Sequence, residues 1–475
     1  MTRLGGLAGG AAVFAFTVAI ACDDGGFNPL SWDRALVVVG AVLLVLVFLV
    51  DGERPGLFAA VVLASLAALT AWTALSYLWS ESPPRSLVES QRIALYLLGG
   101  TAVVLAGRRV SSRAVAAGVA AACTFVALWN LVTRLHGVAD AGDTGALARP
   151  VGYANGLALM CVVGLLLLPR LPRTTWLAGI VLVADLVVQQ SAGALAGLAA
   201  GALLYAFLTW RRLRVVVAAV AIAGLAVSPF ALRGHERTRY WSVAVSETRA
   251  HPVLGSGADT FANWWLRKRT VPLSTREAHS LYLETLAELG PLGLALLLVA
   301  LGVPLAAAIR AREPALAAAL VAYDVAAAVD FHWELAGVTL PIVVIGASAA
   351  VRASPRSDVA PKRALVPALA LVTAAAVLAW AGNARIVSAQ DALRVGNSPG
   401  AVADARNALR FAPYSPDAWR VIGDADRDPA AYRHAIDLDP SDWSLWLGLA
   451  GVTKGAAHRL ALHEAVRLNP LFSGR

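Results

Sequence analysis

The chain has 475 residues, of which 58% are hydrophobic and only 15% are charged. A soluble globular protein carries about 25% charged residues, so this composition excludes one long soluble protein and also excludes a disordered chain. The formal net charge is +9, and almost all of the cations are arginine. The three cysteines are too few and lie in settings too apolar for a disulfide framework or a zinc site.

Apolar segments follow one another from the N-terminus to about residue 382. A membrane span needs about 20 apolar residues. Thirteen spans are predicted, near residues 7–22, 35–50, 57–78, 93–107, 114–133, 154–169, 175–190, 192–209, 214–231, 281–309, 314–331, 336–351 and 364–382. The predicted fold class is therefore all-α: a polytopic membrane helix bundle of about 12–13 spans over residues 1–382, followed by a small α-helical repeat domain over residues 383–475.

Arginines predict the orientation of the spans, because short cytoplasmic loops collect Lys and Arg. Alternate loops carry such residues, as in the stretch from Arg108 to Arg113, and Arg3 puts the N-terminus on the same side. The intervening loops are mixed or acidic, as at 140–143. We therefore expect an N-terminus inside and a C-terminus outside. The first segment also faintly resembles a signal peptide cleaved before Cys22, and cleavage would leave the later topology unchanged.

The loop 232–280 departs from the charge rule, since it lies outside by this count and still carries eight cations and four anions. Long loops are translocated largely regardless of their charge, so the excess is permitted. One interpretation is simple solubility. The other is a binding site for an anionic ligand at the outer membrane surface, because the planar guanidinium fork of arginine makes paired hydrogen bonds to phosphate oxygens.

The soluble tail carries three copies of a short pattern that ends in proline. The copies lie at 408–413, 435–440 and 465–470, spaced by 27 and 30 residues, and each is predicted to be a helix end. The pattern resembles tetratricopeptide repeats, whose period is 34 residues. Such a tail is either a docking surface for a protein or glycan partner or a passive cap, and the sequence leaves both open.

Polar residues gather where the loop 232–280 meets the next span. His279 and Ser280 begin this stretch, and Glu288 follows about 13 Å further along the helix axis at 1.5 Å per residue. A carboxylate at that depth is costly, so we expect it to face the bundle interior and a partner, either His279 or an arginine. Gly290 and Pro291 should break the helix and free backbone groups that a polar cavity could use.

Together these residues resemble the signature of the O-antigen ligase and polymerase superfamily over roughly residues 75–350. The resemblance rests on His279-Ser280 with Glu288-Leu289-Gly290-Pro291-Leu292-Gly293, on Arg237 to Trp241 with His251 to Gly257 and Phe261, on Gly152 to Ala158, and on Leu78-Trp79-Ser80. The chain departs from the family at Ala192, in the triplet Ser191-Ala192-Gly193, where relatives often carry arginine.

The resemblance implies transfer of a glycan from an undecaprenyl-diphosphate carrier to an acceptor hydroxyl at the outer face of the bacterial cytoplasmic membrane. Arg237 is the first candidate to stabilise the diphosphate, and His279 is the candidate base for the acceptor hydroxyl. Arg149 or Arg239 would replace the missing arginine. The remaining candidates are Arg276, Asn155 and Ser280 for substrate binding, and Glu288, Gly290 and Gly293 for structural roles.

The expected partners are the lipid-linked glycan and membrane lipids. No metal, cofactor or nucleic acid is expected, since the loop lacks a clustered Asp-x-Asp and arginine can replace a cation. Asp185 and Asp324 lie inside predicted spans, and we expect each to pair with a neighbouring group in the packed bundle rather than to take part in catalysis. Three alternatives stay open: a polymerase that extends one lipid-linked glycan with another, a transporter or flippase of lipid-linked sugars, and a catalytically inactive scaffold.

Overall fold

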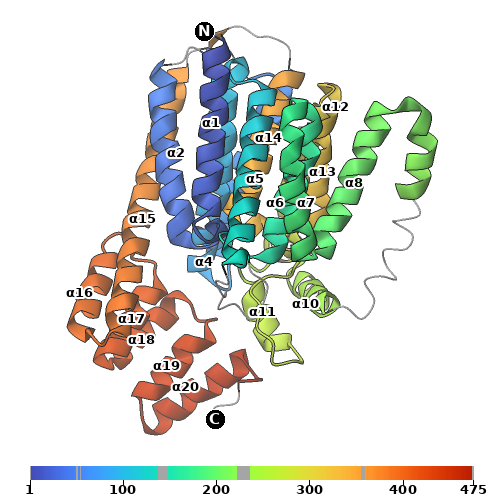
Figure 1. Ribbon diagram of the computed structural model, residues 1–475. Helices are drawn as coiled ribbons and strands as arrows, with labels where there is room; N and C mark the ends of the chain where they lie inside the picture. The colour runs from blue at the N-terminus through green and yellow to red at the C-terminus, as the bar shows by residue number, and fades with distance from the viewer. Residues whose placement is uncertain are drawn as a thin grey trace.

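The computed structural model describes residues 2–49, 52–53, 55–136, 148–221, 236–354, 359–360 and 362–472. These residues are almost entirely helical, and the helices stand side by side in a bundle with a smaller group of helices at one end (Figure 1). The predicted span 214–231 and the start of the loop 232–280 lie partly outside the described residues, and the acidic stretch 140–143 lies wholly outside them.

The bundle contains most of the long helices. Its helices are α1 (Thr2–Ala21), α2 (Pro29–Leu49), α3 (Leu57–Leu75), α4 (Pro83–Ala106), α5 (Ser112–Leu135), α6 (Ala154–Leu167), α7 (Ala178–Gln189), α8 (Ala192–Thr209), α12 (Leu281–Arg310), α13 (Pro314–Ala327), α14 (Ala336–Ala353) and α15 (Val366–Arg394). Two two-residue strands, β1 (Gly52–Glu53) and β2 (Val359–Ala360), pair in an antiparallel way.

Hydropathy accounts for the bundle. Seven of the described helices are long and apolar enough to cross a membrane, namely those of α2, α3, α5, α8, α12, α14 and α15, and shorter apolar helices occur in α1, α6 and α13. The predicted polytopic helix bundle is thus confirmed. Helix α4 begins ten residues before the predicted span at 93, because Pro83 and Pro84 suit a first helical turn and the polar residues after them remain helical.

The C-terminal group of helices grows directly out of the last bundle helix. Helix α15 has 29 residues and continues unbroken past the predicted domain boundary at 382/383. At this boundary α15 packs closely against the residues that follow α16, because a Cβ added to Gly382 would lie 2.7 Å from the Cβ of Ala412. The tail helices are α16 (Ser398–Ala408), α17 (Pro416–Asp426), α18 (Pro429–Leu438), α19 (Trp443–Val452) and α20 (Gly455–Leu468).

The three proline patterns of the tail coincide with helix ends. Helix α16 ends at Ala408, α18 ends two residues before Pro440, and α20 ends two residues before Pro470. The second and third predicted helix ends are thus confirmed, whereas α16 ends five residues before Pro413. The likeness to tetratricopeptide repeats stays a prediction.

Two short helices of the loop 232–280 and the whole tail lie at the same end of the bundle (Figure 1). These helices are α10 (Arg237–Ala250) and α11 (Phe261–Lys268). The N-terminus lies at the opposite end. We call the end that holds α10, α11 and the tail the site end. The two termini therefore lie at opposite ends of the bundle.

Candidate functional site

A fully buried aspartate at the site end gathers four hydrogen-bond donors. Helix α13 ends at Ala327, and the connection that follows it carries Asp330, whose exposed fraction is 0%. One carboxylate oxygen accepts hydrogen bonds from the Tyr153 hydroxyl at 2.7 Å and from the backbone N–H of Phe331 at 2.9 Å. The other oxygen accepts a hydrogen bond from the Asn155 side chain at 2.8 Å. The carboxylate therefore sits in a preformed nest of donors.

Arg237 completes this nest from a distant part of the chain. It is the first residue of α10, and its Nη2 lies 3.2 Å from the same oxygen of Asp330 that Asn155 contacts. The Arg237 side chain is only 16% exposed. A buried carboxylate is costly unless it is paired and hydrogen-bonded, and both conditions hold here. The structure thus brings together Arg237 and Asn155, which the sequence analysis had singled out separately.

His279 lies against the same cluster through its ring. Its backbone has a φ of +53°, an uncommon value for a residue other than glycine. The imidazole stacks on Tyr240, one turn after Arg237 on α10, with ring centroids 4.9 Å apart. Its other neighbour is the Phe331 ring, edge-on at 4.9 Å. His279 is therefore packed between α10 and the connection that carries Asp330.

One hydrogen bond fixes the tautomer of His279. Its Nδ1 lies 3.1 Å from the backbone carbonyl oxygen of Glu277. A carbonyl oxygen can only accept, so Nδ1 carries the hydrogen and Nε2 of the neutral ring offers a lone pair. Burial lowers the pKa of His279 below its usual value, although Asp330 and the Glu277 carbonyl oppose that shift. The imidazole is therefore neutral near pH 7.

Asp330 lies beyond the end of α13 and stays ionised in spite of its burial. Burial favours the neutral acid, but His332, Arg237 and His279 outweigh it and lower the pKa of Asp330. Both ring nitrogens of the fully buried His332 lack a hydrogen-bond partner among the described residues. Neither group was predicted from the sequence, because Asp330 lies inside the predicted span 314–331 and His332 directly follows it. The signal that could have found them is an Asp-x-His pair directly after an apolar run.

The other predicted arginines are more exposed than Arg237. Arg239 lies on the exposed side of α10, and Arg149 is exposed before the start of α6. Arg276 is 58% exposed, and its Nη2 lies 3.4 Å from the carboxylate of Asp259. Ser280 is buried at the N-cap of α12. Arg237 thus differs from these arginines in being buried beside Asp330.

Glu288 binds backbone groups, where the sequence analysis expected His279 or an arginine. Its two carboxylate oxygens accept hydrogen bonds from the backbone N–H groups of Asp259, Thr260 and Phe261, each at 2.9 Å. These groups belong to the first turn of α11 and the residues before it, which lack partners within that helix. The carboxylate therefore caps α11, and this contact explains how the buried charge is satisfied.

The predicted helix break at Gly290 is present, and three carbonyl groups beside it accept hydrogen bonds from other parts of the chain. Gly290 has a φ of +67° inside α12, and a Cβ there would collide with the carbonyl oxygen of Val253. Around the break, carbonyl oxygens of α12 accept hydrogen bonds as follows: Ala287 from the N–H of Ser256 at 3.1 Å, Glu288 from the N–H of Gly257 at 2.9 Å, and Leu289 from the indole of Trp72 at 2.9 Å. The break thus fastens the segment 251–257 to the bundle.

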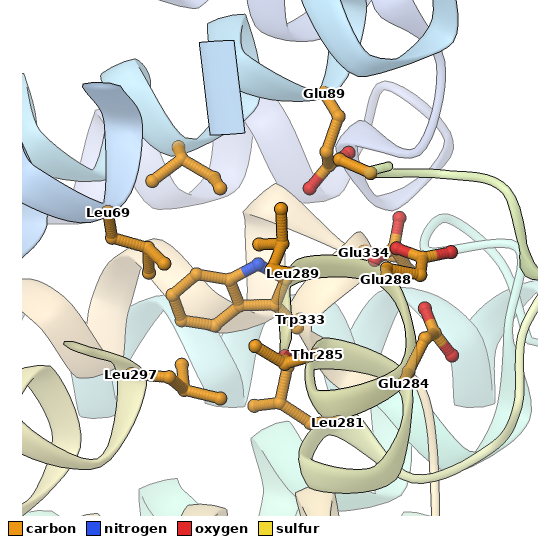
Figure 2. A pocket seen from close by; sticks show the side chains of 12 residues that line it. Leu69, Glu89, Leu281, Glu284, Thr285, Glu288, Leu289, Leu297, Trp333 and Glu334 are labelled. Carbon is orange, nitrogen blue, oxygen red and sulfur yellow. The ribbon is translucent and has the colours of Figure 1, made fainter. Parts of the chain in front are cut away.

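Gly293 also lies at a close approach, where a Cβ would collide with the side chain of Leu289. Beside it, a small cavity is lined by apolar residues on one side and carboxyl groups on the other (Figure 2). Among the described residues, Glu277, Glu284 and Glu334 have carboxylate oxygens within 4.8 Å of one another, a geometry that could hold a cation. Arg92 forms an ion pair with Glu334 and therefore already supplies positive charge there.

Two further predicted positions lie inside or beside the bundle. Asp185 accepts hydrogen bonds from Asn130 at 2.6 Å and from Gln189 at 3.3 Å, which is the packing arrangement the sequence analysis expected. Ala192, which stands at the family's arginine position, is the first residue of α8. The next residue, Gly193, packs against Val329, the neighbour of Asp330 in the chain.

The family comparison covers the segment that carries Arg237 and His279. Residues 177–298 match the O-antigen ligase family. No curated protein matches the chain. The O-antigen ligase segment includes α7, α8, α10, α11 and the first part of α12, whereas Asp330 and Asn155 lie outside it.

The match confirms the resemblance inferred from the motifs. Together with the long apolar helices, it indicates a membrane protein that carries a segment of O-antigen ligase type.

Proposed function

We propose that the protein transfers a glycan from an undecaprenyl-diphosphate carrier to an acceptor hydroxyl at the outer face of the bacterial cytoplasmic membrane. One observation supports this proposal: Arg237 pairs with the buried carboxylate of Asp330, and the ring of His279 packs against Phe331, the next residue in the chain. A cationic group and a neutral base at one site are what glycosyl transfer from a diphosphate requires.

Arg237 would bind the diphosphate and stabilise the charge that develops as the glycosidic bond breaks. Guanidinium presents five N–H donors in a rigid fork. The hydrogen bond to Asp330 uses Nη2, so the carboxylate orients the guanidinium group and leaves other N–H donors for a ligand. A charge held in a fixed position in a water-poor site costs no reorganisation during the reaction. The exposed Arg239, Arg276 and Arg149 would add further contacts to the diphosphate.

His279 would act as the general base. Its Nε2 takes the proton of the acceptor hydroxyl while the hydroxyl oxygen attacks the anomeric carbon. The bond from that carbon to the diphosphate oxygen breaks, and its electron pair leaves with the diphosphate. Direct displacement inverts the anomeric centre. The negative charge of Asp330 favours the imidazolium that forms, because it raises the affinity of His279 for a proton. Asn155 and Ser280 would bind sugar hydroxyls.

The proposed reaction uses no metal ion, because arginine supplies the positive charge for the leaving group. The direct test is to compare transfer in the presence of a chelator with transfer after addition of magnesium or manganese. Equal rates are expected. Loss of transfer on chelation, with recovery on addition of a cation, would move the carboxylates Glu277, Glu284 and Glu334 into the mechanism.

The site end would face outward. The end of the bundle that holds the N-terminus also holds the arginine-rich loops: Arg113 lines a groove with Gly6 and Leu7 of α1. Arg170 and Arg352 lie 2.7 and 3.0 Å from Glu313 in the connection between α12 and α13. Arginine-rich short loops favour the cytoplasmic side. Labelling of single cysteines from outside intact cells tests this orientation: a cysteine at position 249, on α10, should react, and one at position 109, in an arginine-rich loop, should not.

Two alanine variants test the mechanism. Arg237→Ala and His279→Ala should each abolish polymer transfer while the protein still inserts into the membrane. Matched controls are Arg249→Ala, at the exposed end of the same helix, and His463→Ala, on the exposed surface of the tail. Full activity in either test variant removes that residue from the mechanism.

The product distinguishes the proposed ligase from its rivals. Glycan that moves to a different acceptor molecule supports ligation, and glycan that lengthens on the lipid supports a polymerase. Movement of an intact lipid-linked sugar across reconstituted vesicles, with no bond cleaved, supports a flippase.

A further inference from the structure

All three proline turns of the tail contact the membrane bundle or the loop 232–280. Tyr414, next to Pro413, accepts a hydrogen bond from Gln91 of α4 at 3.4 Å. Asp439, next to Pro440, accepts one from Ser82 at 2.6 Å. Asn469, next to Pro470, accepts one from Arg269 at 2.8 Å. The repeated sequence element is therefore also a repeated contact element, which the sequence alone did not reveal.

The middle turn makes a contact that is both polar and buried. Asp439 is 1% exposed, and the Ser82 hydroxyl that it binds is fully buried. Arg85 at the start of α4 lies 3.7 Å from the same carboxylate. On the other side of this turn, the Ser441 hydroxyl accepts a hydrogen bond of 2.7 Å from the Asn263 side chain of α11. One turn of the tail thus joins α4 to α11.

Helix α11 depends on such contacts for its position. It has only eight residues, and a helix that short is not stable by itself in water. Glu288 of α12 caps its first turn from the bundle, and the tail holds it through Asn263 and through Arg269 at its C-cap. The tail therefore adds two side-chain hydrogen bonds to those that the bundle makes with α11.

A short chain of ring contacts leads from α11 to His279. Trp265 of α11 packs edge-on against Tyr240, with ring centroids 4.7 Å apart, and Tyr240 stacks on His279. Trp265 and Tyr240 are buried in one small apolar cluster with Phe261. A shift of α11 would therefore be transmitted to the surface on which the imidazole rests.

We propose that the C-terminal tail is a positioning element of the site: the turn 439–442 holds α11 against the bundle, and α11 in turn holds Tyr240 and His279. Ser441 and Asn263 are then positioning residues for the base. Arg237 is held instead by its ion pair with Asp330. The kinetic part of this inference rests on the proposed function, whereas the structural part stands without it.

Ser441→Ala in the full-length protein tests the structural part by hydrogen–deuterium exchange. Loss of the buried hydrogen bond should raise exchange in residues 261–269 by roughly 5- to 30-fold. Ser441→Thr, which keeps the hydroxyl, should restore protection. Asn263→Ala removes the same bond without altering the tail and should give the same increase. The control Ser388→Ala loses a hydroxyl that bonds to Asp404 of the tail, away from the turn 439–442, and should leave α11 unchanged.

Kinetics of the same variants separate positioning from simple loss of folded protein. In Ser441→Ala, kcat should fall by roughly 3- to 30-fold with the KM for the lipid-linked donor unchanged, because the base moves and Arg237 does not. Ser441→Thr should recover the rate. Unchanged exchange in α11 overturns the proposal whatever the activity. If wild-type protein transfers no glycan, the exchange result still decides whether the tail positions α11.

Discussion

Asp330→Asn is the substitution that most directly tests how the site is held together. Asp330 accepts hydrogen bonds from four groups: the side chains of Tyr153, Asn155 and Arg237 and the backbone N–H of Phe331. An amide has nearly the same shape as the carboxylate but replaces one acceptor oxygen by an NH₂ group. Each carboxylate oxygen accepts two hydrogen bonds. In either orientation of the asparagine amide, its NH₂ group would therefore face two groups that now donate to an oxygen. The same change leaves the buried Arg237 without its counter-ion.

The magnitude follows from the burial of this pair. Breaking a buried ion pair by removing one partner costs about 3–5 kcal/mol. At about 1.4 kcal/mol for each factor of ten, kcat/KM for glycan transfer should fall by roughly two to three and a half orders of magnitude if the cost falls on the transition state. The measurement is a transfer assay with purified protein and a lipid-linked donor. Asp417→Asn, at an exposed position of the tail, is the matched control.

The pH dependence of Asp330→Asn gives an independent readout. The negative charge of Asp330 raises the pKa of His279, so its removal should lower that pKa further. Because the neutral imidazole is the active form, the acid limb of the pH–rate profile should move to lower pH. Wild-type-like kcat/KM in Asp330→Asn, with an acid limb that stays in place, would refute both the role of the carboxylate and the pairing on which it depends.

Three other predictions concern the base, the helix break and a buried acid. In the wild-type protein, burial lowers the pKa of His279, so transfer should fall only as the pH drops below about 6.5, the ordinary histidine value, and the rate should be flat from there to pH 8. Gly290→Ala should destabilise the folded protein by about 1–3 kcal/mol, because the backbone conformation of Gly290 suits only glycine and Val253 blocks a Cβ. The measurement is the melting temperature in detergent, which should fall. Gly302→Ala, in the same helix but with open space around it, should leave the melting temperature unchanged. Burial raises the pKa of Glu247 to about 8, so the stability that its protonated form contributes is complete below about pH 4.5 and is lost as the pH rises toward 8. Glu247→Gln should therefore make the melting temperature less dependent on pH between pH 5 and 8. A melting temperature that still falls with pH as in the wild-type protein would contradict this.

The sequence determined the class of fold and part of the site. Apolar runs of span length are a local property, and they predicted helices such as α12 to within one residue at each end. Proline stops the helix that precedes it by removing an N–H and fixing φ, so the helix ends of the tail were also predictable. The glycine and proline that break α12, and the pair Arg237 and His279, were recognisable from local patterns.

Only the tertiary structure decided which of these residues meet. Asp330 and Arg237 lie 93 residues apart, and Ser82 and Asp439 lie 357 residues apart. Hydropathy and periodicity report how each segment contacts lipid or core, but they carry no information about which polar side chain will find which partner. Glu288 shows the difference: its burial follows from its place in a span, whereas its partners, the backbone N–H groups of α11, follow from the way a broken helix and a distant loop fold onto each other. Partnership between buried polar groups is set by packing, because each of them must find a hydrogen bond in the one arrangement that also buries the apolar surface.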